Sequence, residues 1–451
     1  MNIRRLMYAF GLGILIPGLA SAQTQRLSLR ECLNLALQHN QTLAIARYEE
    51  RVGDQQIRET RARALPQVNV TANLIDNYKR QVLVLPPGFQ MDGPLEVGLK
   101  YGTAVNADAS QALLDASVFT ALKAAKAGRD YYKQNTRQTE EDVINQTAQI
   151  YYRILAVREQ IRAQDSNISK LTNIVEATQG QYNNGLARKI DLDRIKVNLA
   201  NANTQRLQQL NQEAALKANL KMLLGMPAET DIVPEDLSLR EIEQKAAGFV
   251  PAEEFDVEDR TEIQLVDAQI RLSDLQTKAI RAENYPKLSA FFNYSYNGVT
   301  NEFNDYFKSK SNSSALWYGM GSFGLRLSIP IFDGLGRNAR TQQSMIQGLE
   351  LRKRREAVSL SLKANYQQAR TQIVNSISTI KEQKQNVELA SQVYSSSQSN
   401  YNLGLATLTD LLEAQTSYIQ AQNSYTQALL DYKIAELETI RSAGNLRSLL
   451  Q

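Results

Sequence analysis

Two hydrophobic periods alternate along this chain of 451 residues. In four short stretches apolar and polar residues alternate one by one, which is typical of β-strands with one apolar face. These stretches are residues 67–78, 99–113, 287–297 and 317–331. In two much longer stretches, residues 116–225 and 336–447, apolar residues recur instead at every seventh position. The heptads predict two hairpins of long helices whose side chains interlock.

The chain runs through this order of elements twice. Residues 40–66 align without a gap on residues 260–286, and the sequence YNNGLARKIDL from Tyr182 resembles YNLGLATLTDL from Tyr401. Two matched halves of this length indicate one duplicated unit rather than an array of small modules. The sequence therefore predicts a first structural repeat, a mixed linker region and a second structural repeat, at residues 23–225, 226–258 and 259–451.

Residues 1–22 have the pattern of a cleavable secretory signal peptide. Arg4 and Arg5 precede a short apolar run, and Ala20, Ser21 and Ala22 form a small-residue cleavage site. The rest of the sequence contains no run of about 18 apolar residues, so no transmembrane helix is predicted. If the exported chain crosses a membrane, it must do so as a closed β-barrel.

Composition and motifs argue against several other classes of protein. The formal net charge is +4, whereas a nucleic-acid partner would need a clustered basic face. The short basic run Arg352–Arg355 lies on a helical pattern and is interpreted as a solvated face. Cys32 and His39 are each the only residue of their kind, which leaves no disulfide framework or thiolate zinc site. We expect no cofactor and no enzyme activity, since no nucleophile–base pair or phosphate loop is present.

The strand pairs fit a membrane better than a soluble sheet. Each strand has about ten or more residues, enough for a tilted strand to cross a bilayer. The helices that feed the strands are too long to fold back over a small soluble sheet. Four aromatic residues fall near one strand end, as in an interfacial girdle: Tyr294, Tyr296, Trp317 and Tyr318. Four strands cannot close a barrel, so the edges must pair with other chains; three chains would supply twelve strands.

The whole arrangement resembles the TolC family of outer-membrane efflux and secretion ducts. The resemblance rests on the helix-to-strand junctions at Pro66 and Pro286, the segment IPIFDG from Ile329, and the two paired turns. It implies an α+β membrane protein in the outer membrane of a Gram-negative bacterium. In a homotrimer, four strands per chain would contribute to one twelve-stranded transmembrane β-barrel, and the helical hairpins would form a periplasmic α-barrel.

The resemblance also implies a function and partners. Such a protein is a passive exit duct without catalytic residues. A periplasmic adaptor, or membrane fusion protein, joins it to an inner-membrane pump of the RND or ABC type that supplies the energy. The sequence leaves open whether the cargo is small molecules or exported proteins. The alternative function is a structural coiled-coil envelope protein or adhesin without transport activity, which would have no use for duplicated strand pairs.

The two helical turns, residues 183–188 and 402–407, are the first candidate site. Gly185 and Gly404 can adopt the left-handed conformation that ends a helix and starts a tight reversal. By resemblance, the turns lie at the periplasmic tip and dock the adaptor. The docking candidates are these glycines and the small or apolar residues beside them: Leu186, Ala187, Leu405 and Ala406. The alternative is that the glycines serve only to make the turns.

The second candidate site is a periplasmic gate. Asp410 and Glu413 are three positions apart and share a helix face. They match two acidic positions that ring the narrow entrance in the family. Six carboxylates around a small threefold pore would favour cations and raise some of their own pKa values by repulsion. The alternative is a solvated helix start, where acids interact favourably with the helix dipole.

The family also suggests residues that hold such a gate shut. Asp191 and Tyr401 match positions that help to tie the helical hairpins together. The basic partner of these residues in the family falls on Ala406, which cannot form an ion pair. Arg188, in the first turn, is the candidate to replace that partner.

Overall fold

The computed structural model describes residues 25–83, 95–236, 239–248, 255–309 and 311–450, and the predicted signal peptide lies outside these ranges. Two compact units emerge. The sheet unit comprises Ile45–Thr139 and Asp256–Lys363, and the hairpin unit comprises Met1–Ala44, Glu140–Phe255 and Ala364–Gln451. Both units draw on both halves of the sequence, because the long helices α3 (Ala116–Asn183) and α7 (Gly336–Asn402) carry residues in each.

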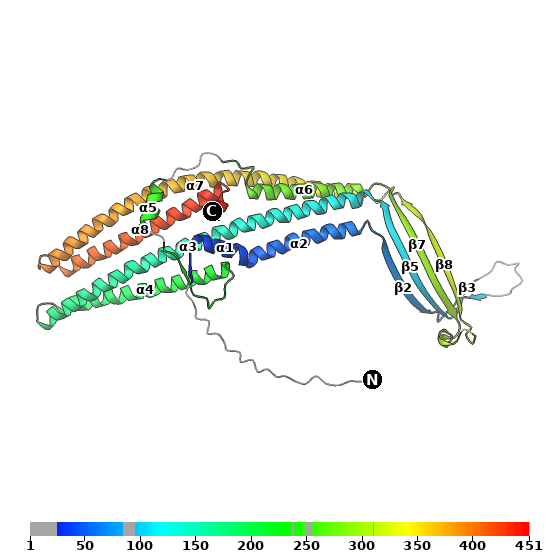
Figure 1. Ribbon diagram of the computed structural model, residues 1–451, viewed down its shortest axis with the longest axis horizontal. Helices are drawn as coiled ribbons and strands as arrows, with labels where there is room; N and C mark the ends of the chain where they lie inside the picture. The colour runs from blue at the N-terminus through cyan, green and yellow to red at the C-terminus, as the bar shows by residue number, and fades with distance from the viewer. Residues whose placement is uncertain (1–24, 84–94, 237–238, 249–254, 310, 451) are drawn as a thin grey trace, which may run out of the picture. The chain divides into compact units, whose positions relative to one another are not determined.

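The sheet unit is built on four antiparallel strands in the order β2-β5-β7-β8 (Figure 1). The strands are β2 (Gln67–Asp76), β5 (Tyr101–Leu114), β7 (Lys287–Thr300) and β8 (Leu316–Ser328). They lie where the alternating pattern predicts strands. The last strand ends at Ser328 rather than residue 331, and Pro330, which has no N–H to donate to a ladder, lies just beyond. A short pair not predicted from the pattern, β3 (Gln81–Leu83) and β4 (Leu95–Val97), lies in the connection from β2 to β5.

The strand register separates an apolar face from a polar face. One row across the sheet is Val70, Ala107, Tyr294 and Gly321, and the adjacent row is Asn69, Asp108, Asn293 and Ser322. On the polar face, the Ser295 hydroxyl donates to the Asn106 side-chain oxygen at 2.7 Å, and the Asn293 amide donates to Asp108. The apolar face is exposed, with Phe323 85% and Leu325 67% accessible. Trp317 lies on the apolar face, whereas Tyr318 lies opposite Asn297 on the polar face.

Helix α6 (Thr261–Ala282) packs against α7 in the sheet unit through polar contacts. The hydroxyls of Thr277 and Ser344 are 2.7 Å apart. The Arg352 guanidinium donates to both carboxylate oxygens of Asp274 at 3.0 and 2.9 Å, and Arg355 Nε donates to Asp267 at 2.6 Å. Arg352, Lys353 and Arg354 are exposed, as expected of a solvated face, and two arginines of the run also bind the acidic face of α6.

Helix α2 (Gln41–Ala62) lies close to α3. A Cβ atom on Gly53 would come within 3.0 Å of the Tyr132 ring and 3.1 Å of Arg129 Cα. The glycine therefore permits an approach of the two backbones that a larger residue would prevent.

The hairpin unit contains the two helical hairpins, in which α4 (Lys189–Leu223) follows α3 and α8 (Leu408–Ser442) follows α7 (Figure 1). Shorter elements complete it: β1 (Gln25–Leu27) pairs in parallel with β6 (Ile232–Pro234), beside α1 (Leu29–His39), α5 (Leu239–Ala247) and η2 (Leu446–Leu450). Apolar side chains of α1, β1, β6 and η2 form clusters with α3, α4 and α8, and those of α5 form a cluster with α7 and α8. These clusters hold the short elements against the long helices of the hairpins.

Helix α1 begins after its N-cap residue, Ser28. The Ser28 hydroxyl accepts a bond from the Glu31 N–H, and the Glu31 carboxylate accepts one from the Ser28 N–H, so a complete capping box is present. Cys32 is fully buried on this helix, and burial raises the pKa of its thiol to about 12. It is a core residue of the hairpin unit.

Candidate functional site

The two hairpins end in turns of the same backbone geometry. In the first, Gly185 has a φ of 74°. Its N–H donates to the Tyr182 carbonyl at 3.0 Å, and the Leu186 N–H donates to the Gln181 carbonyl at 2.8 Å. Gly404, with a φ of 75°, is at the centre of the same pair of bonds in the second turn. These bonds define the Schellman motif, and they confirm the predicted left-handed glycines.

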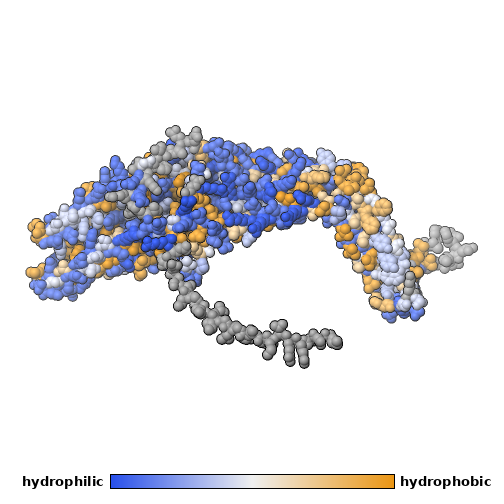
Figure 2. Space-filling model, viewed as in Figure 1, coloured by the Kyte–Doolittle hydropathy of each residue, from blue (hydrophilic) through white to orange (hydrophobic). Residues whose placement is uncertain are grey.

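Exposed leucines surround both glycines. Leu186 is 79% accessible in the first turn, and Leu403 and Leu405 are 72% and 76% accessible in the second. Figure 2 shows hydrophobic patches at the ends of both hairpins. Ala187 and Ala406 are half-buried beside them. Leu403 is an addition to the residues singled out from the sequence, where it precedes the glycine rather than following it.

Asp410 lies in the first turn of α8, where it completes a capping box with Thr407. Its carboxylate accepts bonds from the Thr407 hydroxyl at 2.7 Å and from the Thr407 N–H at 2.9 Å. These two bonds hold the pKa of Asp410 below its ordinary value of 3.8. Asp410 and Glu413 are both exposed. The helix-start role considered for Asp410 is thus present, and it leaves the carboxylate ionised and accessible.

In the first turn, the acidic residue Asp191 is bound by an arginine instead of a threonine. Arg188 is the N-cap residue of α4 but makes no side-chain cap bond. Its guanidinium instead binds Asp191 in a bidentate pair, at 2.8 and 3.1 Å. Arg188 is therefore engaged within its own turn. Tyr401, from the other hairpin, is half-buried and packs against an apolar cluster that includes Ile195 and Leu411.

Among the described residues, polar contacts connect the two hairpins at several levels, and three of them lie towards the turns. Arg194 on α4 donates to the Thr409 hydroxyl on α8 at 2.5 Å. The buried Gln415 side chain on α8 donates to Asn167 on α3 at 2.6 Å. The third contact is the Lys170 ammonium on α3, 4.9 and 5.1 Å from the ring centroids of Tyr394 and Tyr418, which are stacked on each other.

A polar cavity separates α4 from α8 beyond these contacts. It has a volume of about 370 Å³, and amide side chains dominate its lining, among them Asn198, Asn201, Gln205, Gln420 and Asn423. The Gln415 side-chain oxygen, also in this wall, is buried without a hydrogen-bond partner within the described ranges. The space can hold several water molecules, since one water needs roughly 10–15 Å³ of such cavity volume. The two hairpins are therefore not sealed together by a continuous apolar interface.

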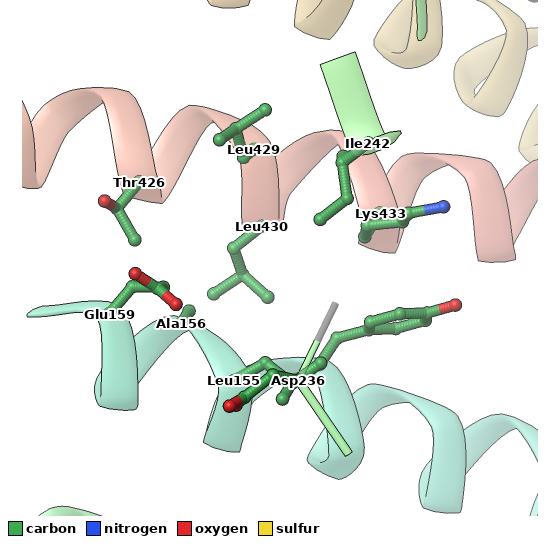
Figure 3. A pocket seen from close by; sticks show the side chains of 10 residues that line it. Leu155, Ala156, Glu159, Asp236, Ile242, Thr426, Leu429, Leu430 and Lys433 are labelled. Carbon is green, nitrogen blue, oxygen red and sulfur yellow. The ribbon is translucent and has the colours of Figure 1, made fainter. Parts of the chain in front are cut away.

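A second pocket in the hairpin unit is lined by apolar residues of α3, α5 and α8, with Glu159, Asp236 and Lys433 at its margin (Figure 3). Its volume is about 30 Å³, room for one or two water molecules. The Lys433 ammonium binds Glu436 at 2.6 Å. The pocket is too small for a transported molecule.

Within the described residues, no group of three or more His, Cys, Asp or Glu side chains is arranged to hold a metal ion. No helix in that part of the chain is long and apolar enough to span a membrane.

Comparison with known proteins gives a consistent result. The family model described as outer membrane efflux protein matches residues 32–226 and 257–445. The outer membrane protein VceC of Vibrio cholerae has the same fold, with 16% identity, 92% of this chain and 96% of that chain covered, and a TM-score of 0.70. No curated protein matches the chain significantly.

Two further solved structures share the fold. The CmeC outer membrane channel of Campylobacter jejuni has 15% identity, covers 99% of this chain and 94% of its own, and gives a TM-score of 0.70. The MtrE outer membrane channel of Neisseria gonorrhoeae, solved in an open state, has 17% identity, coverage of 92% and 89%, and a TM-score of 0.66.

Proposed function

Because the chain belongs to the outer membrane efflux protein family, we propose that three copies assemble into one continuous duct from the periplasm to the outside. Family membership confirms the expected outer-membrane location, the transport function and the resemblance to TolC. It also assigns a passive channel rather than an enzyme or an adhesin. The number of copies, the partners and the gate are the new elements of the proposal.

The observation that carries the trimer is the pair of open sheet edges. Strands β2 and β8 each have only one neighbour in the four-stranded sheet. In a bilayer, backbone N–H and C=O groups without partners cost several kcal/mol each. Pairing β8 of one copy with β2 of the next satisfies both edges, and three copies close twelve strands into a barrel. The exposed face with Phe323 and Leu325 then meets lipid, and the face with Asp108 and Asn293 lines the lumen.

Disulfide trapping tests this pairing. In a Cys32→Ser background, Val70→Cys on β2 is combined in turn with Gly321→Cys, Phe323→Cys or Leu325→Cys on β8. We expect at least one pair to yield covalently linked trimers on a non-reducing gel. The control combines Val70→Cys with Tyr294→Cys on the inner strand β7, which pairs on both sides within its own chain and should give no linked chains. Linkage in the control alone, or in neither case, would overturn the trimer.

At the hairpin ends, we propose that the two turns dock a periplasmic adaptor. The support is the set of exposed leucines on rigid turns, since apolar residues that are held exposed commonly mark an interaction surface. The docking set comprises Gly185, Leu186, Ala187, Gly404, Leu405 and Ala406, with Leu403 added. Leu403→Ser with Leu405→Ser should weaken co-purification of the adaptor without changing trimer yield.

The gate proposal combines an acidic ring with ties between the hairpins. Asp410 and Glu413 of three copies would give six carboxylates at the entrance, ionised and accessible as described above. The contacts of Arg194, Lys170 and Gln415 would hold the second hairpin against the first. Arg188 would keep Asp191 neutralised, and Tyr401 would support the turn by packing. In this arrangement Arg194 and Lys170, rather than Arg188, supply the cationic ties between the hairpins.

The neighbouring genes, rather than this chain, would identify the class of pump and of cargo. Genes for an adaptor and an RND-type pump beside this gene would assign small-molecule efflux. An ABC exporter with a secreted substrate would assign protein export instead.

A further inference from the structure

The connection from β7 to β8 is folded around one buried carboxylate. It contains the 3-10 helix η1 (Phe303–Phe307), at the end of the sheet away from α6 and α7 (Figure 1). Asp305 is 3% exposed. Its carboxylate accepts bonds from the Lys308 ammonium at 2.6 Å, the Thr300 hydroxyl at 3.1 Å and the Ser314 hydroxyl. The Lys308 and Ser314 bonds lower the pKa of Asp305 to about 2, so the network stays intact throughout the physiological pH range.

The register shows which face of the sheet this segment covers. Tyr101, Tyr296 and Trp317 belong to the same apolar face as Phe292 and Phe323. In η1, Phe303 lies edge-on to Tyr101 with ring centroids 5.5 Å apart, and Tyr306 lies edge-on to Trp317 at 5.7 Å.

A backbone contact fixes the same side. The Tyr306 hydroxyl donates to the Gly298 carbonyl at 3.1 Å. Gly298 is opposite Trp317 in the ladder, and a Cβ atom there would come within 2.7 Å of the Trp317 ring. The 3-10 helix therefore folds over the outer, apolar face of the strand ends and not over the polar face.

The segment nevertheless keeps two phenylalanines uncovered. Phe307 is 79% and Phe303 is 41% exposed, and their ring centroids are 5.7 Å apart. The Lys100 ammonium lies 5.0 Å from the Tyr101 ring centroid at the edge of this aromatic group. Exposed phenylalanine rings are unfavourable in water, whereas apolar rings next to a cationic group match the boundary between lipid headgroups and acyl chains.

We propose that η1 is a membrane-interface anchor: Phe303 and Phe307 insert at the headgroup–acyl boundary of the outer leaflet, and Asp305 positions them. The proposal rests on the assignment of the Phe323 face to lipid in the proposed function. The anchor extends the lipid contact from the strands to their loop. It fixes the depth of the strand ends in the membrane through contacts on the lipid-facing side, and it leaves the lumen unobstructed.

Tryptophan fluorescence tests the anchor, because Trp317 is the only tryptophan in the chain. In a Trp317→Phe background, single tryptophans are placed by Phe307→Trp, Phe323→Trp or Ser322→Trp. The full protein is reconstituted in phosphatidylcholine vesicles with brominated acyl chains, and quenching is compared with that by aqueous iodide. We expect Phe307→Trp to be quenched by shallow bromines at least about three times more than Ser322→Trp, which lies on the polar face and should respond mainly to iodide.

Phe323→Trp is the positive control, and it distinguishes failure of the anchor from failure of the lipid-facing assignment. If Phe323→Trp is quenched by brominated lipid and Phe307→Trp only by iodide, the anchor is overturned while the proposed duct stands. If neither is quenched by lipid, the lipid-facing assignment fails, and the anchor fails with it.

A substitution at Asp305 tests its positioning role separately. Asp305→Asn retains the size of the side chain but removes its charge, and it should shift quenching at residue 307 from bromine towards iodide by about two-fold or more. Quenching at residue 323 should stay the same, because the strand ladder does not depend on Asp305. Unchanged quenching at both positions would remove Asp305 from the anchor.

Discussion

The two helical turns share the same backbone geometry, but their acidic residues have partners of different charge. Both place a glycine at a φ near 75° and close the same pair of Schellman bonds. Both also have an acidic residue in the first helical turn that follows. In the first turn Asp191 is neutralised by Arg188, whereas in the second Asp410 is bound only by the hydroxyl and N–H of Thr407. Duplication preserved the geometry, and the residue at the cap decides whether the turn keeps a negative charge.

The difference in partner charge indicates which of the two turns can form an acidic entrance. A hydrogen bond from a neutral hydroxyl orients a carboxylate and leaves its charge in place, while a guanidinium largely cancels the charge. In the proposed gate, the second turn and Glu413 would therefore supply the acidic ring, and the first turn would contribute much less to it. The alignment of the two repeats alone would treat Asp191 and Asp410 as equivalent.

The largest effect is expected from removing charge in the second turn. Asp410→Asn with Glu413→Gln keeps the shape of both side chains and should weaken block by trivalent cations about 100-fold, equivalent to about 2.7 kcal/mol. Asp191→Asn, the matched change in the first turn, should alter the block by less than about two-fold. Both are measured as single-channel conductance in planar bilayers, with cations on the periplasmic side. Unchanged block in the double variant would move the gate elsewhere, with Asp191 the next candidate.

A smaller effect should separate two arginines of the first hairpin. Arg194→Ala removes a tie to the second hairpin and should raise the mean conductance by several-fold, because the hairpins lose a cross-contact. Arg188→Ala should leave the opening unchanged and make cation block slightly stronger, because the guanidinium no longer compensates the negative charge of Asp191. Arg188→Ala with Asp191→Asn should restore the original block. If Arg188→Ala opens the channel more than Arg194→Ala does, the assignment of the tie is reversed.

The pH dependence tests whether the Thr407 bonds or repulsion within the ring dominates at Asp410. A lowered folded-state pKa contributes stability that is present above the ordinary value of 3.8 and is lost as the pH falls through the folded value. Cation selectivity in a Glu413→Gln background should accordingly persist as the pH falls from 7 to about 4. A midpoint clearly above 3.8 would mean that repulsion among the three copies outweighs the cap. Reversal potentials measured across a salt gradient give this midpoint.

The smallest effects concern the stability of the turns. Gly185→Ala and Gly404→Ala should each destabilise by about 1 kcal/mol, and by similar amounts, because an added Cβ meets no atom within 4 Å at either site and only backbone strain remains. Thr407→Ala should also cost about 1 kcal/mol, through loss of the capping box. Arg188→Ala should cost less, since exposed ion pairs contribute little. Chemical denaturation of the assembled protein ranks the four variants.

The parts of this structure that local rules control were predictable from the sequence. Alternating residues predicted the four strands, heptads predicted the hairpins, and a glycine after a long helix predicted each left-handed turn. The capping box of Ser28 and Glu31 also lies within one turn of chain. Each of these features depends on residues only a few positions apart.

The remaining features depend on residues far apart in the chain. Arg194 and Thr409 are separated by 215 positions, and their contact depends on how one hairpin is aligned along the other, which no short pattern records. The pairing of the basic run with α6 was not predictable for the same reason, because its acidic partners lie on another helix. The short β1–β6 pair has three residues on each side, too few for an alternating pattern to stand out.

The open edges of β2 and β8 also have a genetic consequence. If each finished barrel contains edges from three copies, a cell that makes equal amounts of normal and defective chains builds only about one trimer in eight from normal chains alone. A variant that still pairs at its edges but blocks the duct should therefore be strongly dominant. A variant whose edges no longer pair should be recessive, because it is excluded from assembly. Dominance in a mixed population thus reports whether a mutation damages the joint between copies or the passage that they enclose.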